Sequence, residues 1–236
     1  MLHNTPECFS GGFSFLSGEH SFPLSTDTMA LADFVRLKNA SKVVDLGSGS
    51  GALGLLLLAK EPSAHITGIE LHIPSHEAAL NNIARNSLQE KMVSLPGDLR
   101  EIRSFLPANS FSCVVSNPPY YSTGALSQTH ASARQEETCS LKDIFAAAKW
   151  LLPTGGDLFL VHKAERLADL LIFARQYALE AKVIKPLCHK PGDAPSMILL
   201  HCRRGGHPGL RFLPPIYLYE TDGSYTEDYK RIYHIK

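Results

Sequence analysis

The sequence predicts an α/β fold in which a mostly parallel sheet has helices on both faces. Strand-like runs rich in β-branched residues alternate along the chain with helix-like runs. The 236 residues, 44% of them hydrophobic and 19% charged, are enough to build one sizeable core. In such a sheet ligands bind at the carboxyl ends of the strands, so the residues that follow the strands are the first candidates for a site.

The alternation begins at residue 42 and continues to about residue 202. The expected strands are 42–47, 64–71, 91–98, 110–117, 156–162, 181–188 and 196–202. The expected helices are 52–61, 74–87, 140–152 and 166–179. We expect one domain, made of a leading segment at 1–41, a core at 42–204 and a carboxyl-terminal extension at 205–236.

Charge, cysteines and hydropathy narrow the functional classes. The 23 basic and 23 acidic residues balance, so any contact with nucleic acid must come from a local patch. The five cysteines include no C-x-x-C pair, and His72 and His76 have Pro74 between them and no evident third ligand, so no metal site is expected. The longest apolar run, "ALGLLLLA", is too short to span a bilayer, and no signal-peptide pattern opens the chain. We expect a cytoplasmic protein without a membrane anchor.

A glycine-rich loop joins the first expected strand to the first expected helix, in "VVDLGSGSGALG". Glycines let a backbone approach a ligand closely, and a helix start supplies free N–H groups; the alternative is a tight turn without a ligand. Gly49, Gly51 and Gly54 fit the dinucleotide pattern G-x-G-x-x-G. In another register Gly47, Gly49 and Gly51 give G-x-G-x-G, with Asp45 ahead of them. A carboxylate there suits the ammonium and sulfonium of S-adenosylmethionine better than a pyrophosphate, so we favour this cofactor over NAD.

Two further acidic residues end the second and third expected strands. Glu70 lies 21 residues after Gly49, near the spacing at which an acidic side chain takes a ribose hydroxyl. Asp98 is expected to accept the amine of the cofactor adenine while Leu99 packs on the ring. An N-cap of the following helix is an equally good interpretation of Asp98, and the two roles are compatible.

The stretch "CVVSNPPYYSTGA" ends the fourth expected strand at Asn117. Asn-Pro opens a turn and proline has no N–H for the ladder, so the strand stops there. The Asn117 side-chain carbonyl and the Pro118 backbone carbonyl then accept both hydrogens of a planar amine, with Pro119 completing the loop. Tyr120 offers a flat face for an extruded base, and Tyr121 is expected to line the pocket. Taken as structure alone, the stretch is a turn with a packed aromatic; the nearby glycine loop favours catalysis.

The glycine loop together with "SNPPYY" resembles the class I methyltransferases that modify planar amino groups. "FPLSTDTMALADF" is similar to the leading segment of the tRNA adenine-N6 methyltransferases that modify the adenine next to the anticodon of a valine tRNA. "ARQEETCSLKDIFAAAKWLLPTGG", "VHKAERLADLL" and "YLYETDGSYTEDYKRIY" are similar to later segments of that family. The resemblance covers nearly the whole chain. It implies a Rossmann-like fold with a seven-stranded sheet, and methyl transfer from S-adenosylmethionine to the N6 amine of adenine 37.

By this resemblance Thr26 and Asp27 flank the cofactor, although these two also suit a helix N-cap. The other cofactor residues that it implies are Asp45, Gly47, Gly49, Gly51, Glu70, Asp98, Leu99 and Asn117. The residues that it implies at the target base are Asn117, Pro118, Pro119 and Tyr120. The expected partner is tRNA, with Arg134 and Lys190 as RNA contacts, and we expect a monomer or weak dimer without an obligate protein partner.

Three other functions fit parts of the sequence. A glutamine methyltransferase of release factors presents an amide to the same two acceptors, but such enzymes usually have a helical domain ahead of the glycine loop, and only 42 residues precede Val43. A DNA adenine methyltransferase normally has an extra target-reading region, and none is visible. A catalytically silent RNA-binding module is disfavoured because Asn117, Tyr120 and the glycine loop are intact.

Overall fold

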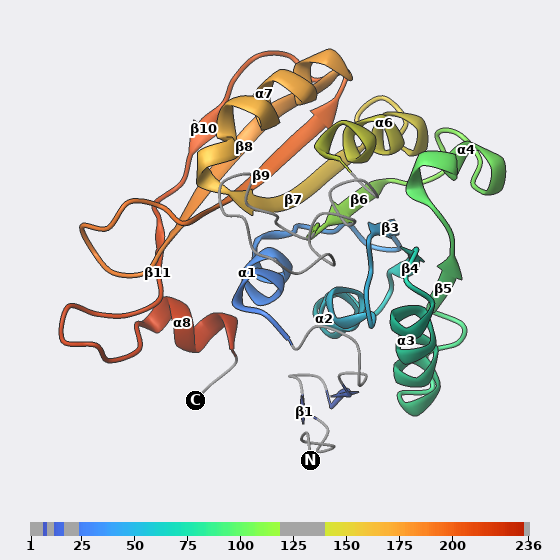
Figure 1. Ribbon diagram of the computed structural model, residues 1–236, viewed down its shortest axis with the longest axis horizontal. Coiled ribbons are helices and arrows are strands. Elements are labelled where there is room, and N and C mark those ends of the chain that lie inside the picture. The colour runs from blue at the N-terminus through green and yellow to red at the C-terminus, as the bar shows by residue number, and fades with distance from the viewer. Residues whose placement is uncertain (1–6, 9–11, 17–23, 119–139, 234–236) are drawn as a thin grey trace, which may run out of the picture.

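The computed structural model describes residues 7–8, 12–16, 24–118 and 140–233, which form a layered α/β arrangement (Figure 1). The strands of the main sheet are β3 (Lys42–Leu46), β4 (His65–Glu70), β5 (Met92–Pro96), β6 (Cys113–Ser116), β7 (Asp157–Lys163), β8 (Leu179–Cys188), β9 (Met197–Arg204), β10 (Arg211–Phe212) and β11 (Ile216–Tyr217). The helices are α1 (Thr26–Phe34), α2 (Ala52–Lys60), α3 (Ile73–Arg85), α4 (Ile102–Phe105), α6 (Leu141–Leu151), α7 (Leu167–Gln176) and α8 (Glu227–Ile232). The short elements are the strands β1 (Glu7–Cys8) and β2 (Ser14–Phe15) and the 3-10 turns η1 (Leu99–Glu101) and η2 (Ala164–Arg166).

The main sheet has nine strands in the order β10, β8, β9, β7, β6, β3, β4, β5, with β11 also paired to β8. Neighbours from β5 to β7 are parallel, whereas β9 runs antiparallel between β7 and β8. The prediction of an α/β fold with a mostly parallel sheet is therefore confirmed. The chain order reverses between β3 and β6, and such a switch point is where open α/β sheets bind their ligands.

The expected count of seven strands is too low. All seven expected strands are present as β3 to β9, and the carboxyl-terminal extension adds β10 and β11 along the outer edge of β8. Each added strand has only two residues. Two residues show no alternation of apolar and polar side chains, so the sequence pattern could not predict them.

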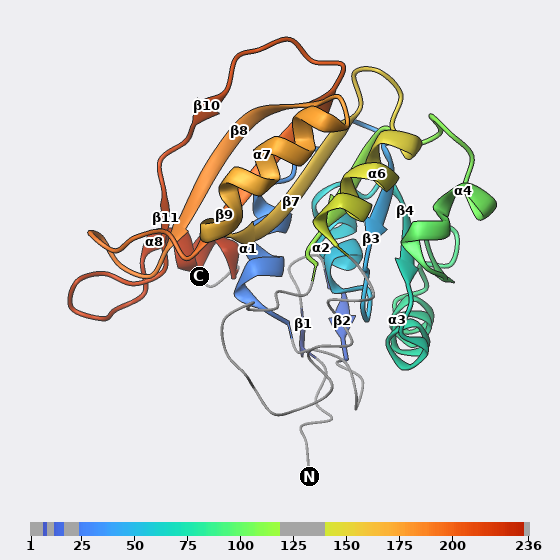
Figure 2. The same cartoon turned by 45° about the horizontal axis from the view of Figure 1, so that its top comes forward.

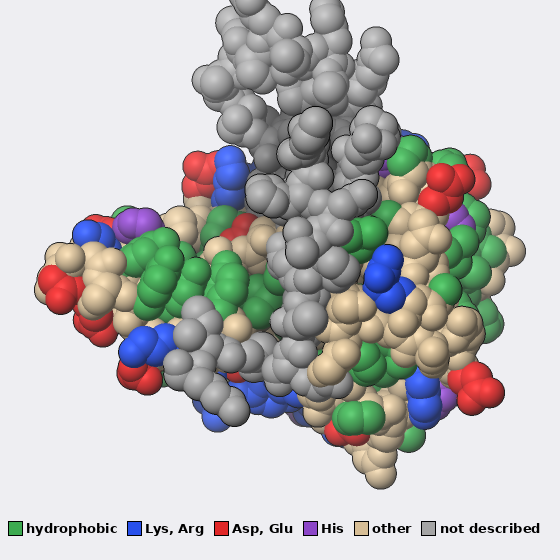
Figure 3. Space-filling model, turned by 90° about the horizontal axis from the view of Figure 1, so that it is seen from below, with side chains coloured by type: hydrophobic (Ala, Val, Ile, Leu, Met, Phe, Trp, Pro, Cys, Tyr) green, Lys and Arg blue, Asp and Glu red, His purple; other side chains and the backbone are tan. Residues whose placement is uncertain are grey.

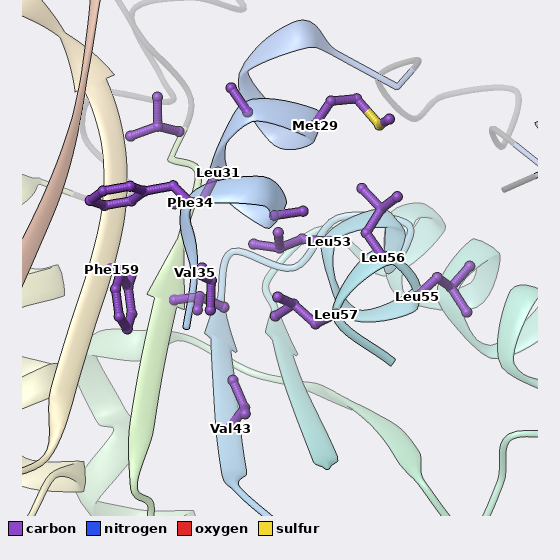
Figure 4. Close-up of a cluster of buried hydrophobic side chains, with 14 of the residues drawn as sticks. Met29, Leu31, Phe34, Val35, Val43, Leu53, Leu55, Leu56, Leu57 and Phe159 are labelled. Atoms are coloured by element: carbon purple, nitrogen blue, oxygen red, sulfur yellow. The ribbon is translucent and has the colours of Figure 1, made fainter. Parts of the chain in front are cut away.

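Helices cover both faces of the sheet: α1, α2 and α3 lie on one face, and α6 and α7 on the other (Figures 1 and 2). Residues 53–58 of α2 are all buried, and they pack with side chains of α1 over the sheet (Figure 4). Phe34 of α1 meets Phe159 of β7 edge to face, with ring centroids 5.8 Å apart. Gly54 permits the close approach of α2, because a Cβ there would lie 2.6 Å from Cε of Met92. This packing fixes α1 and the start of α2 beside the switch point.

Side chains satisfy the backbone groups at both ends of α1. The Ser25 hydroxyl is the N-cap and accepts a hydrogen bond from the Thr28 N–H at 3.2 Å. The Lys60 ammonium of α2 donates at 3.0, 2.8 and 2.7 Å to the carbonyl oxygens of Ala32, Asp33 and Val35. α1 is thereby tied to α2 by polar contacts as well as by apolar packing. Across the described ranges, no helix combines the length and the apolar character that a membrane crossing requires.

Candidate active site

Asp45 lies at the centre of the switch point. It pairs with Gly68 of β4 on one side and with Val115 of β6 on the other. Asp45 is 2% exposed, and its Oδ2 has no hydrogen-bond partner among the residues that the structure describes. Burial, and then the negative charge of Glu70, raise the pKa of Asp45 to about 8. A buried carboxyl oxygen that no donor of the described residues reaches suits a positively charged ligand that binds from solution.

The glycine loop leaves open space above its backbone. Gly47 and Gly49 have φ angles of 74° and 55°, in the left-handed region that side chains rarely adopt. A Cβ at either position would meet no atom of the described residues within 4 Å. The N–H groups of Gly47 and Ser48 both donate to the Ile69 carbonyl, at 2.9 and 3.1 Å. Hydrogen bonds to β4 therefore hold one side of the loop, and the side toward which the Cβ atoms of Gly47 and Gly49 would point has room for a ligand.

Glu70 holds this loop by hydrogen bonds to backbone groups. Its Oε2 accepts from the Gly49 N–H at 2.7 Å, and its Oε1 accepts from the His72 N–H at 2.8 Å. One carboxylate thus joins the glycine loop to the start of α3. Each carboxylate oxygen keeps a further lone pair, so the role toward a ribose stays a prediction beside this structural one.

Asp98 is the N-cap of η1, which confirms the helix-capping role that its sequence position suggests. Its side chain accepts from the Arg100 N–H at 2.9 Å and forms an ion pair with the Arg100 guanidinium. The hydrogen bond from Arg100 outweighs burial and lowers the pKa of Asp98. Leu99 beside it is buried against the α6 face of the sheet. Contact of these two residues with an adenine stays a prediction.

Asn117 follows β6 directly and is held by α1. Its Nδ2 donates to the Thr28 Oγ1 at 2.8 Å, and the Thr28 Oγ1 lies 3.0 Å from the Ser25 Oγ. Pro118 is buried. Pro119 and Tyr120, and with them Tyr121 and Arg134, fall outside the described residues, so their predicted roles stay predictions.

Thr26 and Asp27 occupy the first turn of α1. The suggestion that these two form the N-cap is wrong, because Ser25 has the extended backbone and the capping hydrogen bond. Thr26 Oγ1 instead lies 2.6 Å from the Tyr233 hydroxyl, just past the end of α8. Burial raises the pKa of Asp27, whose side chain is only partly exposed. Their predicted contact with a cofactor stays untested.

Three contacts at the site have little or no signal in the sequence. Two of them are the hydrogen bonds of Thr28 with Asn117 and of Thr26 with Tyr233, which join residues far apart in sequence. A single hydroxyl has no sequence pattern that reveals its partner. Asn82 is buried; it exchanges hydrogen bonds with both backbone groups of Leu16 and donates to the Ser50 carbonyl of the glycine loop, each at 3.0 Å. The sequence signal for Asn82 is that it and Asn86 lie four residues apart, on the side of α3 that also carries buried apolar residues.

The two histidines weighed as zinc ligands bond to serines. The Nδ1 atoms of His72 and His76 lie 2.8 Å from the hydroxyls of Ser75 and Ser94. Within the described ranges, no three His, Cys, Asp or Glu side chains gather as metal ligands would. Lys190 lies in the β8–β9 connection, where its N–H donates to the Asp193 carboxylate.

These residues fit S-adenosylmethionine better than an anionic cofactor. Two acidic side chains adjoin the glycine loop: Asp45 lies in β3 just ahead of it, and Glu70 accepts a hydrogen bond from the Gly49 N–H. Such a set attracts an ammonium and a sulfonium and can accept from ribose hydroxyls, whereas it repels a pyrophosphate. The unpartnered Asp45 oxygen is the strongest single observation for a cationic ligand.

The sequence matches the family model of the methyltransferase small domain over residues 24–172. A relative from Porphyromonas gingivalis, named tRNA1(Val) (adenine(37)-N6)-methyltransferase, is 28% identical over 205 residues, or 79% of this chain and 80% of the relative. A relative of the same name from Vibrio campbellii is 33% identical over 128 residues, or 53% of this chain and 52% of the relative.

Solved structures share the fold. A predicted O-methyltransferase from Agrobacterium tumefaciens has a TM-score of 0.74 at 22% identity, over 89% of this chain and 96% of that chain. Precorrin-6y C5,15-methyltransferase from Geobacter metallireducens has a TM-score of 0.57 at 12% identity, over 80% of this chain and 94% of that chain. The family match runs from α1 through the glycine loop and Asn117 to α7, more than half of the sequence. The chain therefore belongs to the methyltransferase small domain family and is an S-adenosylmethionine-dependent methyltransferase.

Proposed function

We propose that this enzyme transfers a methyl group from S-adenosylmethionine to the exocyclic N6 amine of an adenine in tRNA, at position 37 of a valine tRNA. The observation that supports it most is the placement of Asn117 two residues beyond Val115, the β6 residue paired with Asp45. Acceptors for an amine and for a cofactor cation therefore lie at one edge of the sheet. The names of the relatives from Porphyromonas gingivalis and Vibrio campbellii supply the substrate and the position.

The acidic residues act on the cofactor side of the site. S-adenosylmethionine, when bound, supplies a methyl group on a sulfonium that is open to attack by a nucleophile. Asp45 in its ionised form balances the positive charge, and its burial makes that interaction stronger than it would be in water. Glu70 keeps the glycine loop in the shape that leaves room for the ligand. Binding of a cation and ionisation of Asp45 are consequently coupled.

Asn117 and Pro118 act on the target side. The exocyclic amine of adenine is a weak nucleophile because its lone pair is delocalised into the ring. Two carbonyl acceptors that take both hydrogens favour the pyramidal amine, whose lone pair is free to attack. The proton leaves to water after the new bond forms, so no strong base is needed. Tyr120 is proposed to stack on the extruded base.

The test is label transfer to a defined substrate. The purified enzyme is incubated with methyl-labelled S-adenosylmethionine and, in separate tubes, an unmodified valine tRNA transcript, duplex DNA and a release factor. We expect label in N6-methyladenosine from tRNA, and a transcript with guanosine at position 37 as matched control should take none. Label in glutamine or in DNA adenine would replace the substrate, and no label in any tube would contradict the proposed function.

A further inference from the structure

Four tyrosines in α8 and beside it form a continuous row, which we call the tyrosine row: Tyr219, Tyr225, Tyr229 and Tyr233. The rings of Tyr225 and Tyr229 are stacked at 4.0 Å and those of Tyr229 and Tyr233 at 4.4 Å, within 19° of parallel. Tyr219 packs at 5.4 Å from Tyr225, and His189 extends the row at 4.6 Å from Tyr219. Tyr229 lies in α8 and Tyr233 is its C-cap, whereas Tyr225 precedes the helix and is placed by an antiparallel bridge to Tyr219.

The tyrosine row reaches the surface. Tyr225 is 49% exposed, and the other three tyrosines are partly exposed. In Figure 3 hydrophobic side chains gather at the left of the view, over α8, with a histidine at their outer end. Phe34 and Phe159, by contrast, pack against one another in the core. An exposed aromatic row of this kind marks a contact surface.

One end of the tyrosine row lies at the active site. The Tyr233 hydroxyl lies 2.6 Å from Thr26 Oγ1 in the first turn of α1. Two residues further along the same turn, Thr28 holds the Asn117 amide. The row therefore begins beside the residues that we place at the target amine and leads away from them over the surface.

The charges around the tyrosine row do not exclude a polyanion. The acidic residues of α8 are paired within the helix, Glu227 with Lys230 at 2.7 Å and Asp228 with Arg231. Lys190 follows His189 at the outer end of the row, where its charge interacts with that of the exposed Asp222. On the Arg231 side of α8, Lys185 is close enough to Arg231 and Arg36 for their charges to interact, and the carboxylates of Asp33 and Asp228 lie among these basic groups.

The hydroxyls of the row can donate hydrogen bonds. Burial, and then a hydrogen bond with Tyr225, raise the pKa of Tyr229 to about 12, so this phenol keeps its proton at neutral pH. Neutral phenols donate to phosphate and ribose oxygens, and their rings stack on any base, which is how proteins hold single strands without reading sequence.

We propose that the tyrosine row binds the single-stranded nucleotides next to the target adenine, with a nucleobase stacked on the exposed ring of Tyr225 and ribose or phosphate oxygens on the phenolic hydroxyls. This inference rests on the proposed function, because it takes the substrate to be RNA. It assigns the carboxyl-terminal extension a role in substrate binding, whereas a purely structural row would only attach α8 to α1.

The experiment compares Tyr225→Leu with Tyr225→Phe, which keeps the ring. Phe212→Leu is the matched control, since this aromatic side chain is 66% exposed but lies on β10, away from the row. Each variant is checked by thermal melting and by calorimetry with S-adenosylmethionine. Affinity is then measured by fluorescence anisotropy with a labelled, unmodified RNA stem-loop that has a seven-nucleotide loop. Methylation kinetics give KM for tRNA and kcat separately.

We expect Tyr225→Leu to weaken RNA binding and raise KM for tRNA at least about fivefold, as loss of one stacked base does. Cofactor affinity and kcat should stay within about twofold of the wild type, and Tyr225→Phe and Phe212→Leu should bind RNA normally. Unchanged RNA affinity in Tyr225→Leu would overturn the proposal while leaving the methylation of tRNA intact.

A second measurement does not depend on the folding of a variant. Ultraviolet crosslinking of the wild-type protein to the stem-loop, followed by mass spectrometry, should attach RNA to the peptide that contains Tyr219 and Tyr225. Crosslinks confined to other segments would contradict the tyrosine row as a binding surface. If the wild type binds RNA at the row yet methylates no tRNA, the proposed function fails and the row stands.

Discussion

The Thr28 hydroxyl fixes the amide of Asn117, 89 residues away in sequence, through a hydrogen bond of 2.8 Å from Nδ2. Thr28 Oγ1 also lies 3.0 Å from the Ser25 hydroxyl. If the Thr28 O–H donates to Ser25, its lone pairs face Asn117, and the amide must present its NH₂ to Thr28. The Asn117 carbonyl is then directed to the other side, as an acceptor for a target amine requires.

Removal of that hydroxyl should slow methyl transfer. Thr28→Val keeps the shape of the side chain but loses the hydrogen bond, so we expect kcat to fall about tenfold because the Asn117 amide can rotate. Thr28→Ser, which keeps the hydroxyl, should retain most of the activity. Steady-state kinetics measure both, with cofactor affinity from calorimetry unchanged. Equal kcat values for the valine variant and the wild type would show that the Thr28 hydroxyl does not contribute to methyl transfer.

Asn117→Ala should slow turnover strongly without loss of cofactor binding. The substitution removes an acceptor of the target amine, and loss of such a group typically lowers kcat by about 10²–10³. Asp45 and the glycine loop lie on β3 and its following turn and are not altered. Calorimetry with S-adenosylmethionine checks binding, and single-turnover label transfer checks chemistry. Normal turnover in this variant would rule out the proposed mechanism.

Cofactor affinity should depend on pH through Asp45. Because its pKa in the folded protein is raised to about 8, the carboxyl is protonated at neutral pH until a cation binds. We therefore expect affinity for S-adenosylmethionine to rise from pH 6 to pH 8, with a proton released on binding. Calorimetry in buffers of different ionisation enthalpy measures that proton. An affinity that is flat over this range would show that Asp45 does not meet the cation.

The same residue links cofactor binding to stability. A carboxyl whose pKa in the folded protein lies above its ordinary value of 3.8 stabilises the fold at low pH, and this contribution is lost as the pH rises toward about 8. Asp45→Asn should thus raise the free energy of unfolding of the ligand-free protein at pH 8, by at least about 2 kcal/mol, and bind cofactor poorly. Denaturant titrations at pH 5 and pH 8 measure the difference. An Asp45→Asn protein that is less stable than the wild type at pH 8 would contradict the raised pKa of the Asp45 carboxyl.

Asn82→Ala should loosen the leading segment and the glycine loop together. The variant leaves the Ser50 carbonyl and both backbone groups of Leu16 without their partner, which should cost about 2–3 kcal/mol. Asn81→Ala is the matched control, since Asn81 is the exposed neighbour on the same helix. Thermal melting measures the loss, and limited proteolysis should cleave the Asn82 variant first within the leading segment. Equal stability of the two variants would mean that water replaces the lost bonds.

The sequence predicted those parts of the fold in which local pattern and tertiary structure agree. The strand that contains Asp45 and the turn at Gly47 are recognisable because β-branched residues and glycines have strong local preferences. The position of Asn117 followed for the same reason, since a proline after it stops any strand. The cap of α1 was placed one or two residues late because Ser25, Thr26 and Asp27 all suit an N-cap.

Other features could not be predicted because they depend on contacts between distant parts of the chain. No local pattern pairs Thr26 with Tyr233, or Thr28 with Asn117. Glu70 was expected to face only a ligand, because its position after a strand gives no sign that two backbone N–H groups would converge on it. Two-residue strands such as β10 form only because β8 offers them an edge.

The double hydrogen bond of Glu70 has a consequence for motion. The Gly49 and His72 amides donate to the two oxygens of one carboxylate, so a movement of the Glu70 side chain breaks both hydrogen bonds. The cofactor loop and the first turn of α3 therefore open as one unit, and their amide hydrogens should exchange with deuterium at a common rate. A ligand that displaces the glycine loop should therefore also shift the start of α3, because the Glu70 side chain joins the two segments.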